Sequence, residues 1–218
     1  MKMDFMPNSQ SLKDMPQPPV KVDLEQGTPA WFQYRTRYFN ASEAAAVTGC
    51  SPWMTSNQLL NRKIHADAEE TNQAMVHGHR FEPDARMLAQ QLFNTPDLAP
   101  AVYRRGSYSA SLDAITPDMR LNVEIKCPVR GSQSDLWHKL SRGKLPNHYK
   151  MQLAHQWHVC GTGQNLLMVY CFNQRRSVHL EMSTSELRLL WTDVVETAWT
   201  KFAEEMRLAA ARVARCSP

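Results

Sequence analysis

The sequence predicts an α/β fold in which a mixed central sheet is flanked by helices. Three observations support this prediction: helical periodicity in the N-terminal part, short strand-like segments in the middle, and a long amphipathic segment near the C-terminus. The chain has 218 residues, of which 43% are hydrophobic. Such a chain can bury a substantial core, so we expect one domain over residues 20–218 that ends in the amphipathic helix.

The N-terminal part is predicted to contain an arm followed by three helices. Residues 1–19 are rich in Pro, Gln, Ser and Met and have no clear period, which predicts a mobile arm. Thr28-Pro29 is typical of a helix start, because proline is tolerated at the first helical position, and this helix is expected over 29–38. Two further helices are predicted over 40–49 and 51–61.

The middle of the chain changes from helical to strand-like patterns. Residues 74–93 have helical spacing, although Pro83 requires a kink or a helix start just before it. Beyond them the sequence predicts five strands, with one helix between the third and the fourth. The predicted strands are 102–103, 108–112, 121–125, 166–172 and 178–182, and the helix is 148–160.

The last predicted element is a helix over 185–213. Its apolar residues recur on one face, which indicates that this face packs on the core or on another subunit. These residues are Leu187, Leu190, Trp191, Val194, Val195 and Trp199.

Composition excludes several classes of protein. No run approaches the roughly 18 apolar residues that span a bilayer. Residues 1–20 also lack the apolar stretch of a signal peptide, so we expect a cytoplasmic protein without membrane contact. The five cysteines form no CxxC pair, which argues against a structural zinc site and predicts free thiols. The net charge of +4 permits a nucleic-acid partner without requiring one.

Three ionisable residues in the predicted strands indicate chemistry. Asp113 is followed, after ten residues, by Glu124-Ile125-Lys126. Residues i and i+2 of a strand share a face, so Glu124 and Lys126 project together, and a turn at 116–118 brings Asp113 toward them. Two carboxylates form a hard-oxygen site for Mg²⁺ or Mn²⁺, to which the Ile125 carbonyl could add a ligand. Lys126 could then position or deprotonate a water for phosphodiester hydrolysis. A surface hairpin with a Glu–Lys ion pair is the alternative explanation.

Four blocks of the sequence occur in the order of a known nuclease family. They are Trp31-Phe32-Gln33-Tyr34-Arg35 with Asn40-Ala41-Ser42-Glu43, His77-Gly78-His79-Arg80-Phe81-Glu82-Pro83, Glu124-Ile125-Lys126-Cys127-Pro128, and Tyr149-Lys150-Met151-Gln152-Leu153-Ala154-His155-Gln156. The triple resembles the core motif of the PD-(D/E)XK nuclease superfamily, with Ser-Leu-Asp in place of Pro-Asp. Together, from Trp31 to Trp157, the blocks resemble the phage lambda exonuclease-like family (viral-type alkaline exonuclease, or YqaJ-like viral recombinase). Asn40 departs from the family pattern by replacing a threonine.

The resemblance implies a restriction-endonuclease-like core and a Mg²⁺-dependent exonuclease, with Mn²⁺ as a substitute. It implies 5′→3′ degradation of one strand of double-stranded DNA from its ends. The products would be 5′-phosphomononucleotides and 3′ single-stranded overhangs for recombination. Asp113 and Glu124, with the Ile125 carbonyl, would bind the metal, and Lys126 would act on the water. A homotrimeric ring around DNA and a single-strand annealing recombinase as partner are also implied.

The resemblance assigns roles to four further residues. Glu82 matches a helix carboxylate that borders the metal site, and Gln152 matches a helix glutamine near Lys126. Arg35 and Ser42 match residues that hold the 5′-terminal phosphate of the digested strand. The planar guanidinium of arginine suits this role because it can bind two phosphate oxygens at once.

Two alternatives stay open at this point. The same core could serve an endonuclease of restriction or repair type, or the chain could be a catalytically inactive DNA-binding protein. The sequence does not decide polarity, processivity, oligomeric state or the number of metals, nor whether Gln156 takes part. His77 and His79 are interpreted as ordinary polar positions near the site. Trp53 and Trp137 are candidates for DNA contact.

Overall fold

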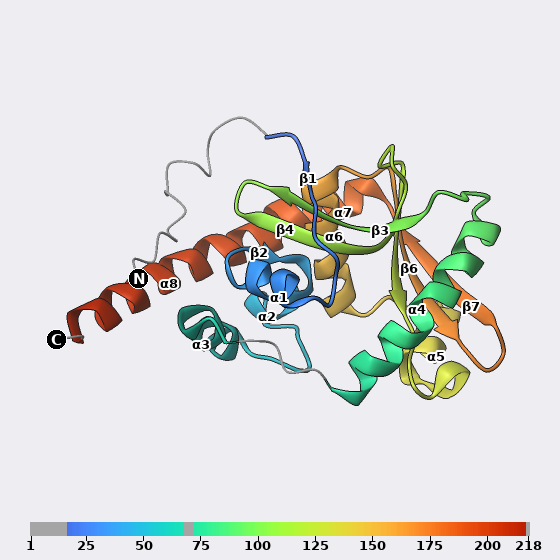
Figure 1. The fold of residues 1–218 in the computed structure, drawn as a ribbon, viewed down its shortest axis with the longest axis horizontal. Helices are drawn as coiled ribbons and strands as arrows, with labels where there is room; N and C mark the ends of the chain where they lie inside the picture. The colour runs from blue at the N-terminus through green and yellow to red at the C-terminus, as the bar shows by residue number, and fades with distance from the viewer. Residues whose placement is uncertain (1–16, 68–71, 217–218) are drawn as a thin grey trace.

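The computed structural model describes residues 17–67 and 72–216. The predicted arm over residues 1–19 lies outside the described residues, except for 17–19. Within the described ranges, seven strands form one sheet in the order β1-β3-β4-β5-β6-β7, with β2 paired to β4 (Figure 1). They are β1 (Val20–Val22), β2 (Phe39–Asn40), β3 (Ala99–Arg105), β4 (Tyr108–Ile115), β5 (Leu121–Lys126), β6 (Gln164–Cys171) and β7 (Arg176–Met182).

The sheet is mixed, as predicted. The pairs β5–β6 and β2–β4 are parallel, and the pairs β1–β3, β3–β4, β4–β5 and β6–β7 are antiparallel. The parallel β5–β6 pair requires a crossover, which the predicted helix between these strands supplies. The helix of that crossover is α6 (Asn147–Cys160), which carries the predicted residue Gln152.

Within the described residues, helices lie before β3, between β5 and β6, and after β7. They are α1 (Pro29–Thr36), η1 (Ala41–Glu43), α2 (Ala44–Val47), α3 (Ser56–His65), α4 (Gln73–Leu92), η2 (Gly131–Gln133), α5 (Asp135–Ser141), α6 (Asn147–Cys160), α7 (Thr184–Leu190), η3 (Trp191–Val195) and α8 (Glu196–Cys216). The helix predicted over 51–61 begins only at Ser56, because Thr55 caps it by accepting a hydrogen bond from the Gln58 N–H at 3.2 Å. The segment predicted as a helix over 40–49 starts with an extended Asn40 in β2. Helix α5 was not predicted.

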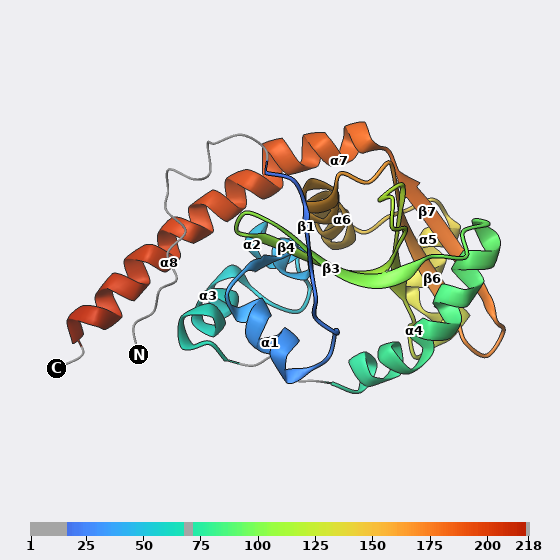
Figure 2. The same cartoon turned by 45° about the horizontal axis from the view of Figure 1, so that its top comes forward.

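The two faces of the sheet are covered by different helices. On one face, Ala85 and Ala89 of α4 belong to an apolar cluster with Val123 and Met168 of the central strands. On the other face, α2, α6 and the C-terminal helix contribute to a second and larger apolar cluster. Figures 1 and 2 show α4 and α6 on opposite sides of the central strands. The central strands are therefore enclosed between the two helices that carry the predicted residues Glu82 and Gln152.

The C-terminal helix is continuous from α7 to α8 and contains the π-helical turn η3 (Figure 2). Four of its buried residues recur every four positions, at Leu187, Trp191, Val195 and Trp199. In a regular α-helix such a series drifts around the axis, because one turn has 3.6 residues. The wider π-turn keeps the series on the buried face. Val194, which regular periodicity placed on that face, is instead 40% exposed.

Among the described residues, no helix combines the length and the apolar character that crossing a membrane requires. Cys50, Cys127, Cys160 and Cys171 are free thiols, as predicted.

Candidate active site

Asp113 lies where the pairing between β4 and β5 ends. The paired residues of these strands are Ala114 with Val123 and Ile115 with Asn122. Directly beyond these pairs, the Asp113 side chain replaces a backbone acceptor: the Ile125 N–H of β5 donates a hydrogen bond to Asp113 Oδ2 at 2.8 Å. The carboxylate is thus fixed next to the strand segment that carries Glu124 and Lys126.

Glu124 is the most enclosed residue of the predicted triple, with an exposed fraction of 1%. Its Oε1 accepts hydrogen bonds from the Lys126 ammonium and from Gln152 Nε2, the latter at 2.7 Å. Its Oε2 accepts a bond from Gln156 Nε2 at 2.6 Å. Hydrogen bonds to a charged acceptor are stronger than neutral ones, and a buried carboxylate requires them. Both glutamines of α6 therefore hold Glu124 in place.

Gln156 is the second glutamine, whose participation the sequence left open. It is fully buried, and its Oε1 accepts a hydrogen bond from Asn122 Nδ2 at 3.0 Å. Asn122 lies on β5 two residues before Glu124 and shares its face. The glutamine thus links α6 to β5 at two points. The i, i+4 spacing of Gln152 and Gln156 is the sequence signal that placed both on one helix face.

The ionisable side chains of the cluster shift each other's pKa values. Burial raises the pKa of Asp113 well above its usual value, and the negative charge of Glu124 raises it further. Burial acts to lower the pKa of Lys126, but the nearby Glu124 and Asp113 outweigh it, so the pKa is raised. Lys126 is therefore an ammonium at neutral pH and can donate hydrogen bonds to a carboxylate, a water or a phosphate.

Glu82 approaches the cluster from α4, and Arg86 holds it there. Arg86 Nη2 donates to Glu82 Oε1 at 2.7 Å, and Arg86 Nε donates to the backbone carbonyl of Asp113 at 2.7 Å. Burial raises the pKa of Glu82, while Arg86 and then Lys126 oppose that rise. Arg86 was not predicted to be a site residue. Its signal was the spacing of four residues from Glu82 on one helix.

The donor set fits a magnesium ion better than a structural zinc ion. Within the described parts of the chain, no three His, Cys, Asp or Glu side chains gather closely enough to hold a metal by themselves. Mg²⁺ commonly uses one or two carboxylates and completes its shell with waters and substrate phosphates. Asp113 and Glu124, with the backbone carbonyl of Ile125 next to Glu124 in the chain, offer such a partial set.

His77 was interpreted from the sequence as an ordinary polar position near the site. Its ring centroid lies 4.8 Å from that of Phe81 and 4.9 Å from that of Phe172, so the side chain packs among aromatic rings.

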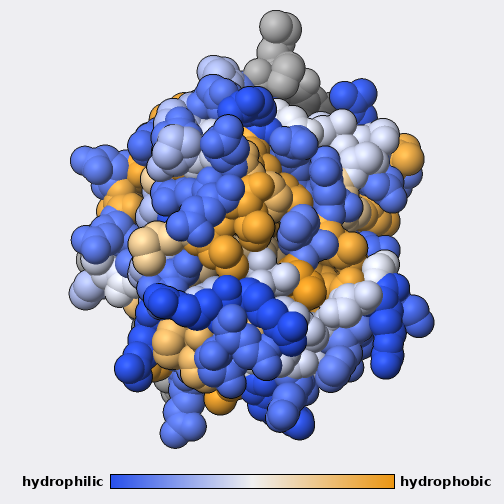
Figure 3. Space-filling view, turned by 90° about the vertical axis from the view of Figure 1, so that its right-hand side faces the viewer, coloured by the Kyte–Doolittle hydropathy of each residue, from blue (hydrophilic) through white to orange (hydrophobic). Residues whose placement is uncertain are grey.

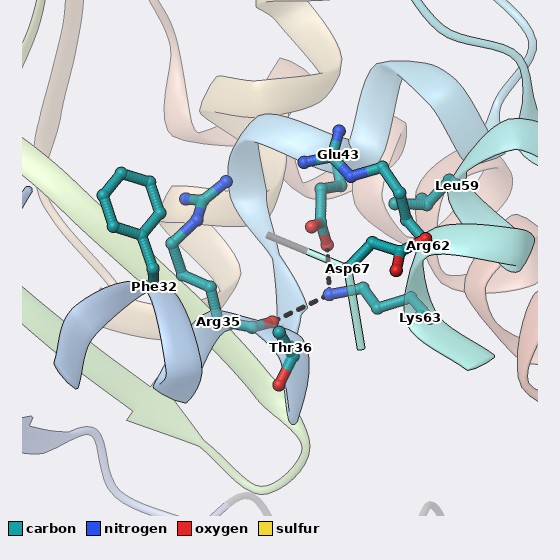
Figure 4. A pocket seen from close by; sticks show the side chains of 8 residues that line it. All are labelled: Phe32, Arg35, Thr36, Glu43, Leu59, Arg62, Lys63 and Asp67. Atoms are coloured by element: carbon teal, nitrogen blue, oxygen red, sulfur yellow. Dashed lines mark hydrogen bonds and ion pairs between the residues drawn. The ribbon is translucent and has the colours of Figure 1, made fainter. Parts of the chain in front are cut away.

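Arg35 and Ser42 lie together in the N-terminal part of the fold. Arg35 Nη2 donates to Ser42 Oγ at 3.1 Å, and the guanidinium lies 4.5 Å from the Trp31 ring centroid. Figure 4 shows the adjacent pocket, in which Lys63 reaches from α3 toward Glu43 and the backbone carbonyl of Arg35. The sequence had predicted that Arg35 and Ser42 act together, and the structure places them in direct contact.

A buried ion pair supports this pair of residues. Lys63 Nζ lies 2.8 Å from Glu43 Oε2, 2.8 Å from the Arg35 carbonyl and 2.7 Å from the Tyr38 carbonyl. Asn40 Nδ2 donates to the same Arg35 carbonyl at 2.7 Å and to Glu43 Oε2 at 3.0 Å. Asn40, the departure from the family pattern, thus has a structural role. Sequence reasoning missed Lys63, which lies 28 positions from Arg35.

Comparisons with known proteins show the family and the fold of the chain. Residues 30–164 match the family described as the YqaJ-like viral recombinase domain. Comparison with curated protein sequences gives no significant match. Among solved structures, the chain is similar to an alkaline exonuclease, LHK-Exo, from Laribacter hongkongensis, with 21% identity and a TM-score of 0.65 over 86% of this chain and 97% of that one.

Two further solved structures are similar. LHK-Exo in complex with dAMP has 20% identity and a TM-score of 0.66, and the match covers 87% of this chain and 100% of that one. A phage-related exonuclease from Haemophilus somnus 129PT has 11% identity and a TM-score of 0.57, over 79% and 96% of the two chains. At these identities the likeness shows the fold, and it confirms the predicted α/β core with a mixed sheet between helices.

Proposed function

Because the chain belongs to the YqaJ-like viral recombinase domain family, we propose that it is a Mg²⁺-dependent exonuclease that digests one strand of double-stranded DNA in the 5′→3′ direction. The reaction would start at DNA ends, release 5′-phosphomononucleotides and leave 3′ single-stranded overhangs for recombination. Mn²⁺ would substitute for Mg²⁺. The family supports a DNA substrate, and the structural likeness to proteins described as exonucleases supports the reaction class.

One observation carries the proposal. Asp113, Glu124 and Lys126 come from two strands whose pairing ends between them, and α6 supplies two amide donors to the most buried carboxylate. A solvated hairpin face, the alternative explanation of this triple, would not enclose Glu124 to 1% exposure. Burying a carboxylate is costly unless it is paired, so an arrangement of this kind is typical of a functional site.

Each residue of the cluster has a distinct role in the proposed hydrolysis. Asp113, Glu124 and the Ile125 carbonyl would hold the metal ion. When bound, that ion supplies Lewis acidity toward the phosphate and lowers the pKa of an attacking water. Lys126 would donate hydrogen bonds to the water or to the non-bridging phosphate oxygens. Glu82 would border the ion from α4.

The α6 glutamines would keep the buried carboxylate oriented while the ion exchanges. Gln152 and Gln156 bond different oxygens of Glu124, so the carboxylate cannot rotate without breaking one of these bonds. Holding a ligand in its productive geometry before substrate arrives is a general source of catalytic power. Gln152 would in addition lie close to the reacting phosphate, since it shares Oε1 with Lys126.

Arg35 and Ser42 would bind the 5′-terminal phosphate. This binding would favour ends over internal positions, because an internal phosphodiester has no terminal phosphate group to offer. The proposed assembly is a homotrimeric ring that encloses DNA, with a single-strand annealing recombinase as partner. Val76, Met87 and Leu92 of α4 are exposed apolar side chains available for such contacts. Apolar patches are also visible on the face of the molecule that Figure 3 shows.

The test is digestion of a linear duplex beside a covalently closed circular duplex, in Mg²⁺ or in EDTA. Each strand of the linear DNA is labelled at a known end, with or without a 5′-phosphate. Wild type is compared with Asp113→Ala and Lys126→Ala, and Asp118→Ala, in the exposed turn between β4 and β5, is the matched control. We expect loss from 5′ ends, faster with phosphate, that spares the circle and requires Mg²⁺, Asp113 and Lys126 but not Asp118.

The other outcomes separate the alternatives. Cutting of the circle would retain the metal site and overturn the exonuclease assignment in favour of an endonuclease. Binding of DNA without cleavage of either substrate by wild type would overturn the enzyme and leave a DNA-binding protein. Digestion from 3′ ends would overturn the polarity alone.

A further inference from the structure

Trp53 is a large aromatic side chain held in solvent beside the proposed active site. It is 70% exposed, whereas tryptophan is usually well buried in folded proteins. The loop that carries it is ordered by Ser51, whose Oγ accepts hydrogen bonds from the Trp53 and Met54 N–H groups, each at 3.2 Å. Trp137, the other candidate for DNA contact, is 7% exposed in α5 and is excluded from that role.

The ring of Trp53 begins a series of aromatic contacts that ends at the catalytic lysine. Its ring centroid lies 4.9 Å from that of His148, at an interplanar angle of 79°, and 6.3 Å from that of Tyr149. The centroids of His148 and Tyr149 are 4.2 Å apart. Lys126 Nζ lies 5.7 Å from the Tyr149 ring centroid. Trp53 therefore stands about two side chains away from the proposed site of phosphodiester cleavage.

Lysine ammonium groups lie near the His148 end of this series, and the Glu124 carboxylate lies near Tyr149. The pKa of His148 is lowered by partial burial and then by the charges of Lys139 and Lys126. Lys139 is also paired with Asp135, but both side chains of that pair are largely exposed, so the pair is weak. Trp53 is an exposed ring that packs on a histidine near two ammonium groups. This matches the general design of sites for single-stranded nucleic acid, in which bases stack on rings and cations contact phosphates.

We propose that Trp53, supported by His148, is a stacking platform for a nucleobase of the strand being digested. This inference rests on the proposed nuclease function, because the phosphate next to that base would be the one held at Lys126. Stacking does not select a base, since each of the four presents a π-face. The platform would thus hold the unpaired end in place without imposing a sequence preference.

The experiment combines a change in the protein with a change in the DNA. Trp53→Ala, Trp53→Phe and wild type are assayed on linear duplexes in which each of the first three 5′-terminal nucleotides of the digested strand is abasic in turn. Leu189→Ala, on an exposed apolar residue of α7, is the control. Single-turnover cleavage in Mg²⁺ and binding affinity in EDTA are both measured, and the native mass of each variant is determined.

We expect one abasic position to weaken wild-type binding and cleavage by about 10-fold, as the loss of one stacked base does. Trp53→Ala should lose about as much on the intact duplex and lose nothing further at that abasic position, while Trp53→Phe should retain most of the effect. An abasic penalty of equal size in wild type and Trp53→Ala would overturn the inference. A changed native mass of Trp53→Ala, with equal losses on all substrates, would also overturn it and place Trp53 in a subunit interface.

Failure of the proposed function would look different. If wild type cleaves nothing in Mg²⁺, the exonuclease proposal fails. The binding measurements in EDTA then still decide about stacking, because they do not depend on cleavage. If wild type cleaves and Trp53→Ala is indistinguishable from it on every duplex, the nuclease stands and the stacking platform is overturned.

Discussion

Arg86 and Asp113 are joined by a hydrogen bond of 2.7 Å from the arginine Nε to the aspartate backbone carbonyl, which ties α4 to the end of β4 that carries the proposed active site. The same guanidinium bonds Glu82. We predict that Arg86→Ala raises the Mg²⁺ concentration for half-maximal digestion by roughly 10- to 100-fold, as the loss of a group that orients metal ligands typically does. A Mg²⁺ titration of linear-duplex cleavage measures this shift.

Arg80→Ala is the control for this prediction, because Arg80 is an exposed arginine on the same helix. Arg86→Lys should recover little, since one ammonium cannot reproduce the two directed bonds of the guanidinium. An unchanged Mg²⁺ requirement in Arg86→Ala would contradict the positioning role, even if the maximal rate fell.

The buried pair of Lys63 and Glu43 gives the second prediction. Lys63→Met leaves the Glu43 carboxylate buried without its cation, which costs about 3–5 kcal/mol in the free energy of unfolding. It also frees the Arg35 carbonyl from one of its donors. We therefore expect a loss of stability in urea and a smaller preference for 5′-phosphorylated over 5′-hydroxyl ends.

A double variant separates charge from packing at this pair. Lys63→Met with Glu43→Gln removes both charges and should regain part of the lost stability, because no unpaired charge remains. Lys201→Met, at an exposed position of α8, should change neither quantity. Equal stability of Lys63→Met and wild type would sink the prediction.

Local sequence patterns were sufficient to predict most helices and strands of the fold. They failed where contacts distant in the sequence, or the geometry of a helix, determine the structure. The strands around Asp113 and Glu124 and the α6 crossover were predicted because their apolar runs and turn residues are local signals. Pro83 is accommodated within α4 without ending it. Its side chain faces solvent, where water can satisfy the carbonyl that loses its helical donor.

The site was predictable only as far as the motifs extended. The resemblance assigned Gln152 to the site but left the participation of Gln156 open. The structure adds that Gln156 donates a hydrogen bond to the buried Glu124. Arg86 and Lys63 act on backbone carbonyls that lie 27 and 28 positions away. Local periodicity cannot predict such contacts, because every residue of the chain has a backbone carbonyl and the sequence does not indicate which one will accept the bond.

Gly131 gives the third prediction. It has φ +47°, and a Cβ there would lie 2.9 Å from Cys171 Sγ. Gly131→Ala therefore adds a steric clash with a buried β6 side chain to the strain of the left-handed backbone, and we expect a loss of about 2–3 kcal/mol in urea unfolding. Gly143→Ala has φ +70° and no atom within 4 Å of the added Cβ, so it should lose only about 1 kcal/mol. Equal losses in both variants would contradict the role of the clash.

The last prediction concerns acid sensitivity. His158 stacks on Trp191, with ring centroids 3.7 Å apart, and burial followed by the charge of Arg105 lowers its pKa to about 3. The unfolded chain binds this proton near the ordinary value of about 6.5. Between these two pH values the unfolded state holds more protons, so stability falls as the pH falls from 6.5 toward 3. The loss is about 1.4 kcal/mol per pH unit for this group.

His158→Phe isolates this contribution, because it keeps an aromatic ring on Trp191 but cannot be protonated. Asp113 and Glu82 have raised pKa values and give the opposite slope, but they do so equally in both proteins. The unfolding free energy of His158→Phe minus that of wild type should therefore rise by about 1.4 kcal/mol between pH 6 and pH 5 in urea titrations. Exposed His65→Phe is the control. A difference that stays constant with pH would mean that His158 is protonated in the folded protein.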